Sequence, residues 1–312
     1  MKKILVLGAS SFAGSSFFEY LNDNFQYNLL GTYNSKKNIN KLFKKKNIIK
    51  RLIKLNLNKK DNNLLSIIKN FKPNYIFDFA SVCLVNESWK NPMYYFNVNV
   101  NSKLELIACL HKMDFLKKFI YISTPEVFGS NDKFINENNQ NFNPSTPYAL
   151  SKLSCEKALL NYNNFFKKKS IITRFSNFYG LRQMNHRLIP KFIKCIKSNK
   201  KFPLQGKGLS KRNFIFEDDF NNGLIKVMNK GVNGKIYHFS SSEYFKIREV
   251  VKLICKLYKV SFSDLVYYTT DRIGKDKNYF LSCNYTKRKL KWFPKYTLSK
   301  GLIKIINHYK SL

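Results

Sequence analysis

Short runs of β-branched and aromatic residues alternate with stretches of helical periodicity through the first half of the chain, and this alternation restricts the fold most. The expected strands are Lys3–Leu7, Asn28–Thr32, Lys50–Leu55, Tyr75–Phe79, Lys118–Ile122 and Ser170–Arg174. The expected helices between them are Phe12–Asn24, Asp61–Phe71, Pro92–Met113 and Thr146–Lys168. Such alternation predicts right-handed βαβ units, and therefore an α/β fold with a doubly wound parallel sheet. Ligands are then expected at the carboxyl ends of the strands.

The first expected strand runs directly into a segment of small residues. Gly8-Ala9-Ser10-Ser11-Phe12-Ala13-Gly14 lies between that strand and the first expected helix. Small residues at such a turn let the amino terminus of a helix approach a pyrophosphate. An ordinary tight strand-to-helix turn has the same spacing. Its place at the start of a βαβ chain favours dinucleotide binding, as in a Rossmann fold.

The pattern changes after about Asn177 to loops, two or three helices and a short strand near Lys235–Phe239. We therefore expect a dinucleotide-binding Rossmann domain over residues 1–176. We expect a smaller C-terminal α/β substrate lobe over residues 177–312, interleaved with the first domain. The Asn-rich stretch Asn136–Asn143 is expected to form a loop.

The chain is strongly basic, with a formal net charge of +37. Dense Lys and Arg can neutralise phosphates, so a nucleic-acid partner is one interpretation. However, lysine contributes 48 of the 56 basic residues and is abundant together with Asn, Ile, Phe and Tyr. These are residues of A+T-rich codons, so base composition explains the surplus, and we expect no nucleic-acid partner.

The six cysteines and four histidines are spread singly along the chain. This spacing favours reduced thiols in a cytoplasmic protein, with neither a disulfide framework nor a metal site. Every apolar run is interrupted by polar residues well before the roughly 20 residues that a membrane span needs, so no membrane association is expected.

A tyrosine and a lysine stand four residues apart at the start of the fourth expected helix. In Tyr148-Ala149-Leu150-Ser151-Lys152 they share one helical face, where the cation can lower the tyrosine pKa. The spacing alone is uninformative, because Tyr33/Lys37, Tyr285/Lys289 and Tyr296/Lys300 share it. Tyr148 is selected by its position after the fourth and fifth expected strands, where the pair would face the sheet ends.

The fifth expected strand ends in Ile122-Ser123-Thr124-Pro125-Glu126-Val127-Phe128-Gly129, which places a hydroxyl and a carboxylate at its carboxyl end. One interpretation is a ligand-binding edge. The other is a turn in which Ser123 or Thr124 caps the backbone and Glu126 is solvated.

With these segments, the chain resembles the NAD-dependent epimerase/dehydratase family of the extended short-chain dehydrogenase/reductases. Within that family it is most similar to nucleotide-sugar 4,6-dehydratases such as dTDP-glucose 4,6-dehydratase, over essentially its whole length. Further segments that carry the resemblance, in matching order, are Asp78-Phe79-Ala80-Ser81, Glu87-Ser88-Trp89-Lys90-Asn91-Pro92, Asn97-Val98-Asn99-Val100, Arg174-Phe175-Ser176-Asn177-Phe178-Tyr179-Gly180, Arg187-Leu188-Ile189-Pro190, Pro203-Leu204-Gln205-Gly206, Arg212-Asn213-Phe214 and Asp271-Arg272-Ile273-Gly274-Lys275-Asp276.

The resemblance implies NAD as cofactor, a nucleotide sugar as substrate, and a homodimer formed through Pro92–Met113 and Thr146–Lys168. The cofactor-binding residues it implies are Gly8, Ser11, Phe12, Ala13, Gly14, Asn56, Leu57, Ala80, Ser81, Asn99, Tyr148 and Lys152. The substrate-binding residues it implies are Asn177, Arg187, Leu188, Pro203, Gln205, Arg212 and Arg272, with the last two arginines on the diphosphate.

The resemblance also implies a catalytic set of Thr124, Glu126, Tyr148 and Lys152. Tyr148 would take the proton of the sugar 4-hydroxyl as hydride leaves for the nicotinamide. Lys152 would hold the ribose and lower the tyrosine pKa, and Thr124 would orient the hydroxyl.

Three departures from the family pattern bear on these expectations. Ser11 replaces the middle glycine, which a small side chain tolerates if φ is not positive there. Tyr33 and Asn34 follow the second strand where NAD-specific members carry an acidic residue, and Lys36 and Lys37 lie just beyond, which leaves NADP open. Pro125 stands where the dTDP-glucose dehydratases have an aspartate.

Glu126 is retained beside Pro125, and we therefore expect a dehydratase that oxidises C4, eliminates water across C5 and C6 and returns the hydride to C6. The alternatives within the family are a nucleotide-sugar 4-epimerase and a UDP-glucuronate decarboxylase. An alternative of another class is a binding protein that has kept the fold and lost turnover. The complete Thr/Tyr/Lys set argues against that one.

Overall fold

The computed structural model describes residues 1–36, 39–43, 45–59, 63–271 and 273–311, and its centre is a seven-stranded sheet with the order β12-β7-β5-β4-β1-β2-β3. Its strands are β1 (Lys3–Leu7), β2 (Asn28–Tyr33), β3 (Leu52–Lys54), β4 (Tyr75–Asp78), β5 (Lys118–Ser123), β7 (Ser170–Phe175) and β12 (Ile236–Phe239). All neighbouring pairs are parallel. The chain builds outward from β1 to β3 and then returns to β4 on the other side of β1. The topological switch point, where such sheets bind ligands, therefore lies between β1 and β4.

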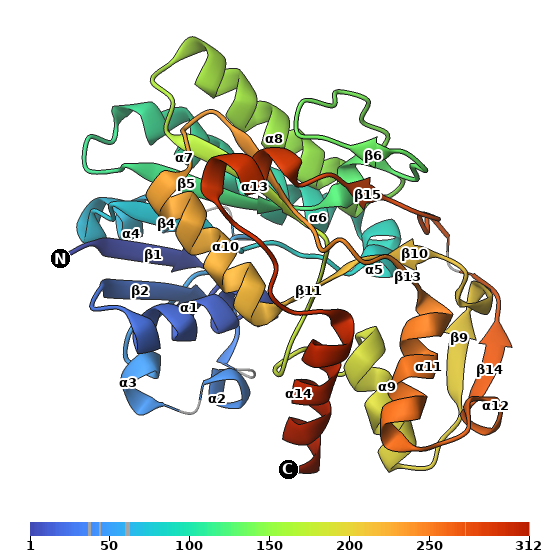
Figure 1. Ribbon diagram of the computed structural model, residues 1–312. Coiled ribbons are helices and arrows are strands. Elements are labelled where there is room, and N and C mark those ends of the chain that lie inside the picture. The colour runs from blue at the N-terminus through green and yellow to red at the C-terminus, as the bar shows by residue number, and fades with distance from the viewer. Residues whose placement is uncertain (37–38, 44, 60–62, 272, 312) are drawn as a thin grey trace.

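Helices cover both faces of this sheet (Figure 1). One face carries α1 (Phe12–Asn24), α10 (Glu217–Lys230) and α13 (Asn284–Leu290), together with the short α2 (Ile39–Leu42) and α3 (Lys46–Ile49). The other face carries α4 (Leu64–Phe71), α7 (Ser102–Cys109) and α8 (Pro147–Phe165). The fold is the expected α/β doubly wound sheet.

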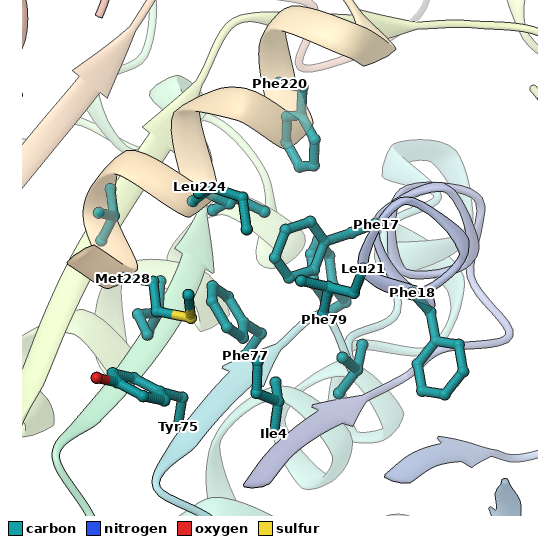
Figure 2. Packing of buried hydrophobic residues seen from close by; sticks show 14 of the residues in the cluster. Ile4, Phe17, Phe18, Leu21, Tyr75, Phe77, Phe79, Phe220, Leu224 and Met228 are labelled. Atoms are coloured by element: carbon teal, nitrogen blue, oxygen red, sulfur yellow. The ribbon is translucent and has the colours of Figure 1, made fainter. Parts of the chain in front are cut away.

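Strand β4 shows how sequence alternation builds the two layers. Tyr75 and Phe77 belong to the cluster with α1 and α10, whereas Ile76 between them packs in the cluster with α4, α7 and α8. Figure 2 shows Phe77 facing Leu224 and Met228 of α10 and the side chains of α1. Both clusters are almost wholly excluded from water, so the sheet is buried on its two faces, as a parallel sheet requires.

The strands and helices of this domain occur close to their expected positions. Strand β1 and helix α1 have the expected bounds, and α8 begins one residue late because the Thr146 hydroxyl accepts a hydrogen bond from the N–H of Ala149 and caps it. The expected helix Asp61–Phe71 occurs as α4, and Asp61 lies outside the described residues.

The long expected helix Pro92–Met113 is interrupted. It occurs as α6 (Pro92–Phe96), a π-helical segment η2 (Asn97–Asn101), α7 and a final 3₁₀ turn η3 (Leu110–Lys112). Such π-helical segments occur frequently at functional sites. This one carries Asn99 into the candidate site described below.

The C-terminal part adds a smaller lobe, seen beside the sheet in Figure 1. Its elements are β8 (Asn177–Tyr179), α9 (Leu188–Lys197), β9 (Phe202–Gln205), η5 (Gly206–Gly208), β10 (Lys211–Arg212), β11 (Phe214–Phe216), β13 (Phe245–Lys246), α11 (Ile247–Tyr258), α12 (Phe262–Leu265), β14 (Val266–Thr269) and α14 (Leu298–Lys310). Helices α9, α11 and α14 pack around Phe192, Ile254 and Leu302. The described residues after Asn177 contain more helices than the two or three expected.

The strand expected near Lys235–Phe239 is present as β12, yet it pairs with β7 in the large sheet and not within the lobe. Phe239 of β12 stacks on Phe175 of β7 with ring centroids 4.4 Å apart, so the strand extends the apolar edge of the sheet. Helix α10 likewise returns to pack on α1. Among the described residues, no helix combines the length and hydrophobicity needed to cross a membrane.

Candidate active site

The turn between β1 and α1 is built on two glycines in close contact with their surroundings. Gly8 has φ +73°, and a β-carbon there would lie 2.7 Å from the Ala80 nitrogen at the end of β4. A β-carbon at Gly14 would lie 2.3 Å from the Gly8 carbonyl oxygen. Only glycine therefore allows α1 to begin so close to the turn and to β4.

Ser11 fits this turn without strain. Its backbone has φ −82° and ψ 163°, and its hydroxyl accepts a hydrogen bond from the Gly14 N–H at 3.0 Å. The condition set for a non-glycine residue at this position is met, because φ is negative. Ser11 also caps the helix, which is a favourable role for serine.

The turn and helix fit the pyrophosphate of a dinucleotide. Helix α1 has 13 residues, and no acidic side chain stands in its first turn, where Phe12, Ala13 and Gly14 lie. The positive end of its dipole therefore points to the β1/β4 switch point, and its own first turn carries no carboxylate. Ala80 and Ser81 follow β4 at the same edge.

The expected residues after β3 lie at the neighbouring strand ends. The Leu55 N–H donates to the carbonyl of Tyr33 at 2.8 Å, which brings Asn56 and Leu57 alongside the end of β2. Leu57 is buried, and the Asn56 side chain accepts the N–H of Asn58 at 3.0 Å. Lys36 is exposed in this region, and Lys37 lies outside the described residues.

The catalytic candidates Thr124, Glu126 and Tyr148 come together at the carboxyl end of β5. Thr124 caps η4 (Pro125–Phe128), with its hydroxyl 3.3 Å from the Glu126 N–H, and it also forms a hydrogen bond with the Tyr148 hydroxyl. Pro125 occupies the first position of η4, where a proline is well tolerated. The capping interpretation therefore holds for Thr124, although Glu126 is half-buried and not solvated. The ligand-binding interpretation stays a prediction.

The pKa of Tyr148 is raised well above 10, contrary to the lowering expected from a Lys152 neighbour. Burial is the main cause, the nearby Glu126 and Cys83 side chains add to it, and Arg187 and the Thr124 hydrogen bond oppose it. Glu126 thus lies within electrostatic reach of the phenol. Tyr148 is protonated at neutral pH in this structure.

Lys152 is fully enclosed one turn after Tyr148 on α8. Its ammonium donates to the Ile122 carbonyl at 2.8 Å and lies 4.1 Å from the centre of the Tyr121 ring. Burial and, after it, the positive charge of Lys103 lower the pKa of Lys152 to about 8. Lys152 therefore loses its proton in a mildly alkaline range.

Asn99 supports the site through hydrogen bonds to two other segments of the chain. It is fully buried, its amide oxygen accepts the N–H of Val82 at 2.9 Å, and its amide nitrogen donates to the Val82 carbonyl and to Ser151. The Ser151 hydroxyl in turn donates to the carbonyl of Tyr148. Asn99 thereby connects the segment after Ala80 with the helix that carries Tyr148 and Lys152.

The substrate-binding candidates line the lobe side. Arg187 is exposed at the start of α9, its guanidinium donates to the Cys83 sulfur at 3.3 Å, and Leu188 follows it. The Asn177 side chain accepts from the Tyr279 hydroxyl at 2.8 Å. Pro203 lies in β9 beside β14, and Gln205 is exposed at the end of β9.

Arg212 holds the segment that connects the lobe with the sheet domain. Its guanidinium donates to the carbonyls of Lys211, Asp276 and Lys277 and lies 4.3 Å from the centre of the Tyr279 ring. Arg272 lies outside the described residues. Arg212 thus anchors the Asp276 end of the expected closing loop.

The middle of this loop, at Gly274, contacts the segment just before Tyr148. The Ser145 hydroxyl donates to the Gly274 carbonyl at 3.2 Å, and a β-carbon at Gly274 would lie 2.9 Å from the Ser145 carbonyl oxygen. Asp271 packs against Gly206 of η5. The loop therefore extends from the lobe to the residues just before Tyr148.

Sequence reasoning missed Cys83, which lies beside Tyr148 and Arg187, and the buried ion pair between Asp78 and Lys103. Asp78 was noted only as part of a strand end. Lys103 could not be distinguished from the other lysines among the 48, because its partner Asp78 is 25 residues away in sequence.

Known proteins of one family share the sequence pattern and the fold of this chain. A model of the NAD dependent epimerase/dehydratase family matches residues 4–239. Human dTDP-D-glucose 4,6-dehydratase is 31% identical over 245 residues, which cover 77% of this chain and 69% of that protein. The dTDP-D-glucose 4,6-dehydratase of Dictyostelium discoideum is 31% identical over 282 residues, covering 82% of this chain and 62% of that protein.

Solved structures show the same fold. The dTDP-glucose 4,6-dehydratase of Bacillus anthracis, crystallised with NAD, superposes with a TM-score of 0.89 at 26% identity and covers 100% of this chain and 97% of that one. A mutant of UDP-glucuronic acid 4-epimerase from Bacillus cereus, solved with a fluorinated substrate analogue and NAD, has a TM-score of 0.89 at 23% identity, covering 99% of each chain. The chain is thus an enzyme of the NAD-dependent epimerase/dehydratase family, with NAD as its cofactor.

Proposed function

We propose that the chain is a nucleotide-sugar 4,6-dehydratase. The observation that supports it best is Glu126, a half-buried carboxylate at the end of β5 within electrostatic reach of the Tyr148 phenol. Oxidation at C4 alone needs Tyr148, Lys152, Thr124 and the cofactor. Elimination also needs a base for the C5 proton, and Glu126 is placed beside the residues that handle C4.

The turn from Gly8 to Gly14 would hold NAD, which when bound would supply a hydride acceptor for C4 and a hydride donor for C6. Thr124 orients the sugar 4-hydroxyl, and Tyr148 takes its proton. Because the pKa of Tyr148 is raised, the phenolate has to be stabilised when substrate binds, and the Thr124 hydrogen bond and the Arg187 charge act in that direction. The Lys152 ammonium supplies positive charge on the same helical face and binds the ribose hydroxyls.

Glu126 then acts on the neighbouring carbons. A ketone at C4 makes the C5 proton acidic, and the Glu126 carboxylate removes it. The resulting carboxylic acid donates that proton to the leaving hydroxyl at C6, so water departs and Glu126 returns to its starting state. When hydride adds at C6, C5 takes a proton that originates from solvent. Pro125 contributes no proton donor, so one residue performs both transfers.

Two other reactions of the family are rivals. A 4-epimerase would use Tyr148 and Lys152 in the same way and would leave Glu126 without a role. A UDP-glucuronate decarboxylase would lose carbon dioxide after the same oxidation. The dTDP-D-glucose 4,6-dehydratases at 31% identity support the dehydratase, and the shared fold of the solved 4-epimerase supports neither reaction.

The lobe supplies the nucleotide-sugar site in this proposal. Arg187 brings positive charge next to Cys83 near Tyr148, and Arg212 holds the Asp276 end of the expected closing loop, whose sequence includes Arg272. Arginine suits diphosphates because its planar fork donates two parallel hydrogen bonds. Asn177, Leu188, Pro203 and Gln205 complete the proposed substrate contacts.

We further propose a cytoplasmic homodimer. The helices α6, α7 and α8 contact one another and carry exposed apolar side chains: Met93, Tyr94, Leu104 and Leu150. A second copy of the same helices would cover this face. In sedimentation velocity the wild type should be a dimer and Leu104→Glu a monomer. If the wild type is a dimer and the variant has the same sedimentation coefficient, the interface lies elsewhere. The six free cysteines are consistent with a reducing compartment.

The reaction is tested by incubating the purified protein with a panel of nucleotide sugars and recording native and product masses. Binding of one nucleotide sugar and a product lighter by one water are expected. A product with the mass of its substrate would favour the epimerase, and loss of carbon dioxide from a glucuronate would favour the decarboxylase.

A further inference from the structure

The Asp78–Lys103 pair lies directly behind the cofactor turn and has no role in the reaction described so far. The Lys103 ammonium lies 2.6 Å from the Asp78 carboxylate, and each residue is only 1% exposed. Asp78 ends β4, and Lys103 comes from α7 on the face of the sheet that also carries α8. A fully buried ion pair adds little stability compared with apolar residues, so its retention calls for another explanation.

Both members of the pair bind the backbone of the same residue, Ala80, on its two sides. The Asp78 carboxylate accepts the N–H of Ala80 at 3.0 Å, and the Lys103 ammonium donates to the Ala80 carbonyl at 2.6 Å. Ala80 is the residue whose nitrogen comes within 2.7 Å of a β-carbon placed on Gly8. The ion pair therefore fixes the backbone that packs against the cofactor turn.

The pair also faces Lys152. The Lys103 and Lys152 ammonium groups lie 5.4 Å and 4.1 Å from the centre of the same Tyr121 ring, and Tyr121 is paired with Asp78 across β4 and β5. Lys152 meanwhile donates to the Ile122 carbonyl, on the strand that leads to Thr124. Asp78 is therefore a buried anion close to two buried cations, Lys103 and Lys152. Of these two, Lys103 forms the ion pair with it.

We propose that Asp78 and Lys103 are positioning residues: they hold the Ala80 peptide against the Gly8 turn, and Lys103 satisfies the Asp78 carboxylate so that Lys152 stays at Ile122, facing the site. This inference rests on the proposed roles of Ala80 and Lys152 in binding NAD. An Asp78 carboxylate without Lys103 would attract the Lys152 ammonium, because buried opposite charges interact strongly at low effective dielectric.

The pH dependence of Lys152 separates this role from simple structural support. The groups that face its ammonium are Lys103 on α7, Asp78 on β4, Tyr121 on β5 and Cys155 and Glu156 on its own helix. Lys103 lowers the pKa of Lys152 and Asp78 raises it, and Lys103 has the larger influence. Removing the Lys103 charge should therefore raise the pH at which Lys152 loses its function. Removing the Asp78 charge should lower that pH.

The experiment compares NAD affinity by calorimetry over a pH series of about 6 to 10 in wild type, Lys103→Met, Asp78→Asn and the double variant. Lys169→Met is the matched control, since Lys169 is also buried and donates to two carbonyls, Met113 and Leu116, outside the site. Lys103→Met should weaken NAD binding about tenfold or more, as expected for a residue that supports a binding group. The double variant should bind more tightly than Lys103→Met.

The pH at which affinity declines should rise in Lys103→Met, fall in Asp78→Asn and rise modestly in the double variant. If these midpoints and affinities stay as in Lys169→Met, the proposal is overturned. If both single variants fail to fold, the proposal is overturned when the pH at which NAD affinity declines is the same in the double variant as in the wild type. NAD binding needs no sugar, so a wild type that turns over no nucleotide sugar refutes the dehydratase and leaves this test intact.

Discussion

The Gly14→Ala substitution tests the cofactor site through a single methyl group. The added β-carbon would lie 2.3 Å from the Gly8 carbonyl oxygen and 2.9 Å from the Ser11 hydroxyl oxygen. The first distance is about 1 Å inside ordinary van der Waals contact. The opposing atom is backbone, so the turn and the start of α1 must separate. A displacement of about 1 Å in a binding site can reduce function about a hundredfold.

The effect can be measured as the rise in melting temperature that NAD produces. At an NAD concentration about a hundred times the wild-type Kd, binding stabilises the protein by about 2.7 kcal/mol. With a Kd a hundredfold weaker, the same concentration contributes about 0.4 kcal/mol. For a chain of this size, these values correspond to rises of about 5 °C and about 1 °C.

The matched control is Gly231→Ala, at the end of α10. A β-carbon there would lie 2.5 Å from the Val227 carbonyl oxygen, a similar backbone clash away from the cofactor turn. This variant should melt earlier than the wild type and keep the full NAD-dependent rise. An equal rise in Gly14→Ala and wild type would refute the reasoning, as would an equal loss in both glycine variants.

Three further outcomes are expected. Tyr148→Phe should abolish C4 oxidation, measured as reduced cofactor in a single turnover. Tyr237→Phe also removes a buried hydroxyl, one that accepts the Val232 N–H outside the site, and should lose about 1 kcal/mol of stability and keep activity; equal activity in both variants would remove Tyr148 from the mechanism. Glu126→Gln removes a charge that raises the pKa of Tyr148. The pH below which C4 oxidation slows, because the phenolate is protonated, should therefore fall in a pH–rate profile. An unchanged profile on the acid side would contradict the placement of Glu126. DNA and RNA should bind weakly, without sequence preference and with steep loss as salt rises, in fluorescence anisotropy; nanomolar binding at physiological salt would overturn the compositional explanation of the +37 charge.

Much of the sheet domain could be predicted, because its strands are buried on both faces and read as continuous apolar runs. Strand β1 and helix α1 occur with the expected bounds. The short pairs in the lobe could not be predicted. Strand β10 has two residues, and its partner β13 lies more than thirty residues later, so neither has a periodicity of its own.

The interruption of the helix expected at Pro92–Met113 also left no trace in the sequence. Its π-helical segment contains Asn99, whose amide bonds Val82 and Ser151 on other elements. Asn and Val, which make up the segment, are weak helix formers, but this weakness does not predict π-helical geometry. The altered geometry accompanies the tertiary contacts of Asn99. Element bounds of this kind depend on the folded partners.

At the candidate site, the residues could be expected from motifs, while their electrostatics could not. Tyr148 and Lys152 share a helical face as the spacing required, but the phenol pKa is raised because burial and Glu126 outweigh the expected effect of the lysine. Burial depends on the whole fold. The Asp78–Lys103 contact likewise depends on α7 packing behind β4.

The central claim, that Glu126 removes the C5 proton after oxidation at C4, is tested most directly in deuterated water. With the wild type, the product should be lighter by one water, apart from the label, and should carry deuterium at C5. With Glu126→Gln, reduced cofactor and 4-keto sugar should form, while water loss should fall about 10²- to 10⁴-fold. A wild-type product that keeps its original C5 proton and the mass of the substrate would contradict the account and favour a 4-epimerase.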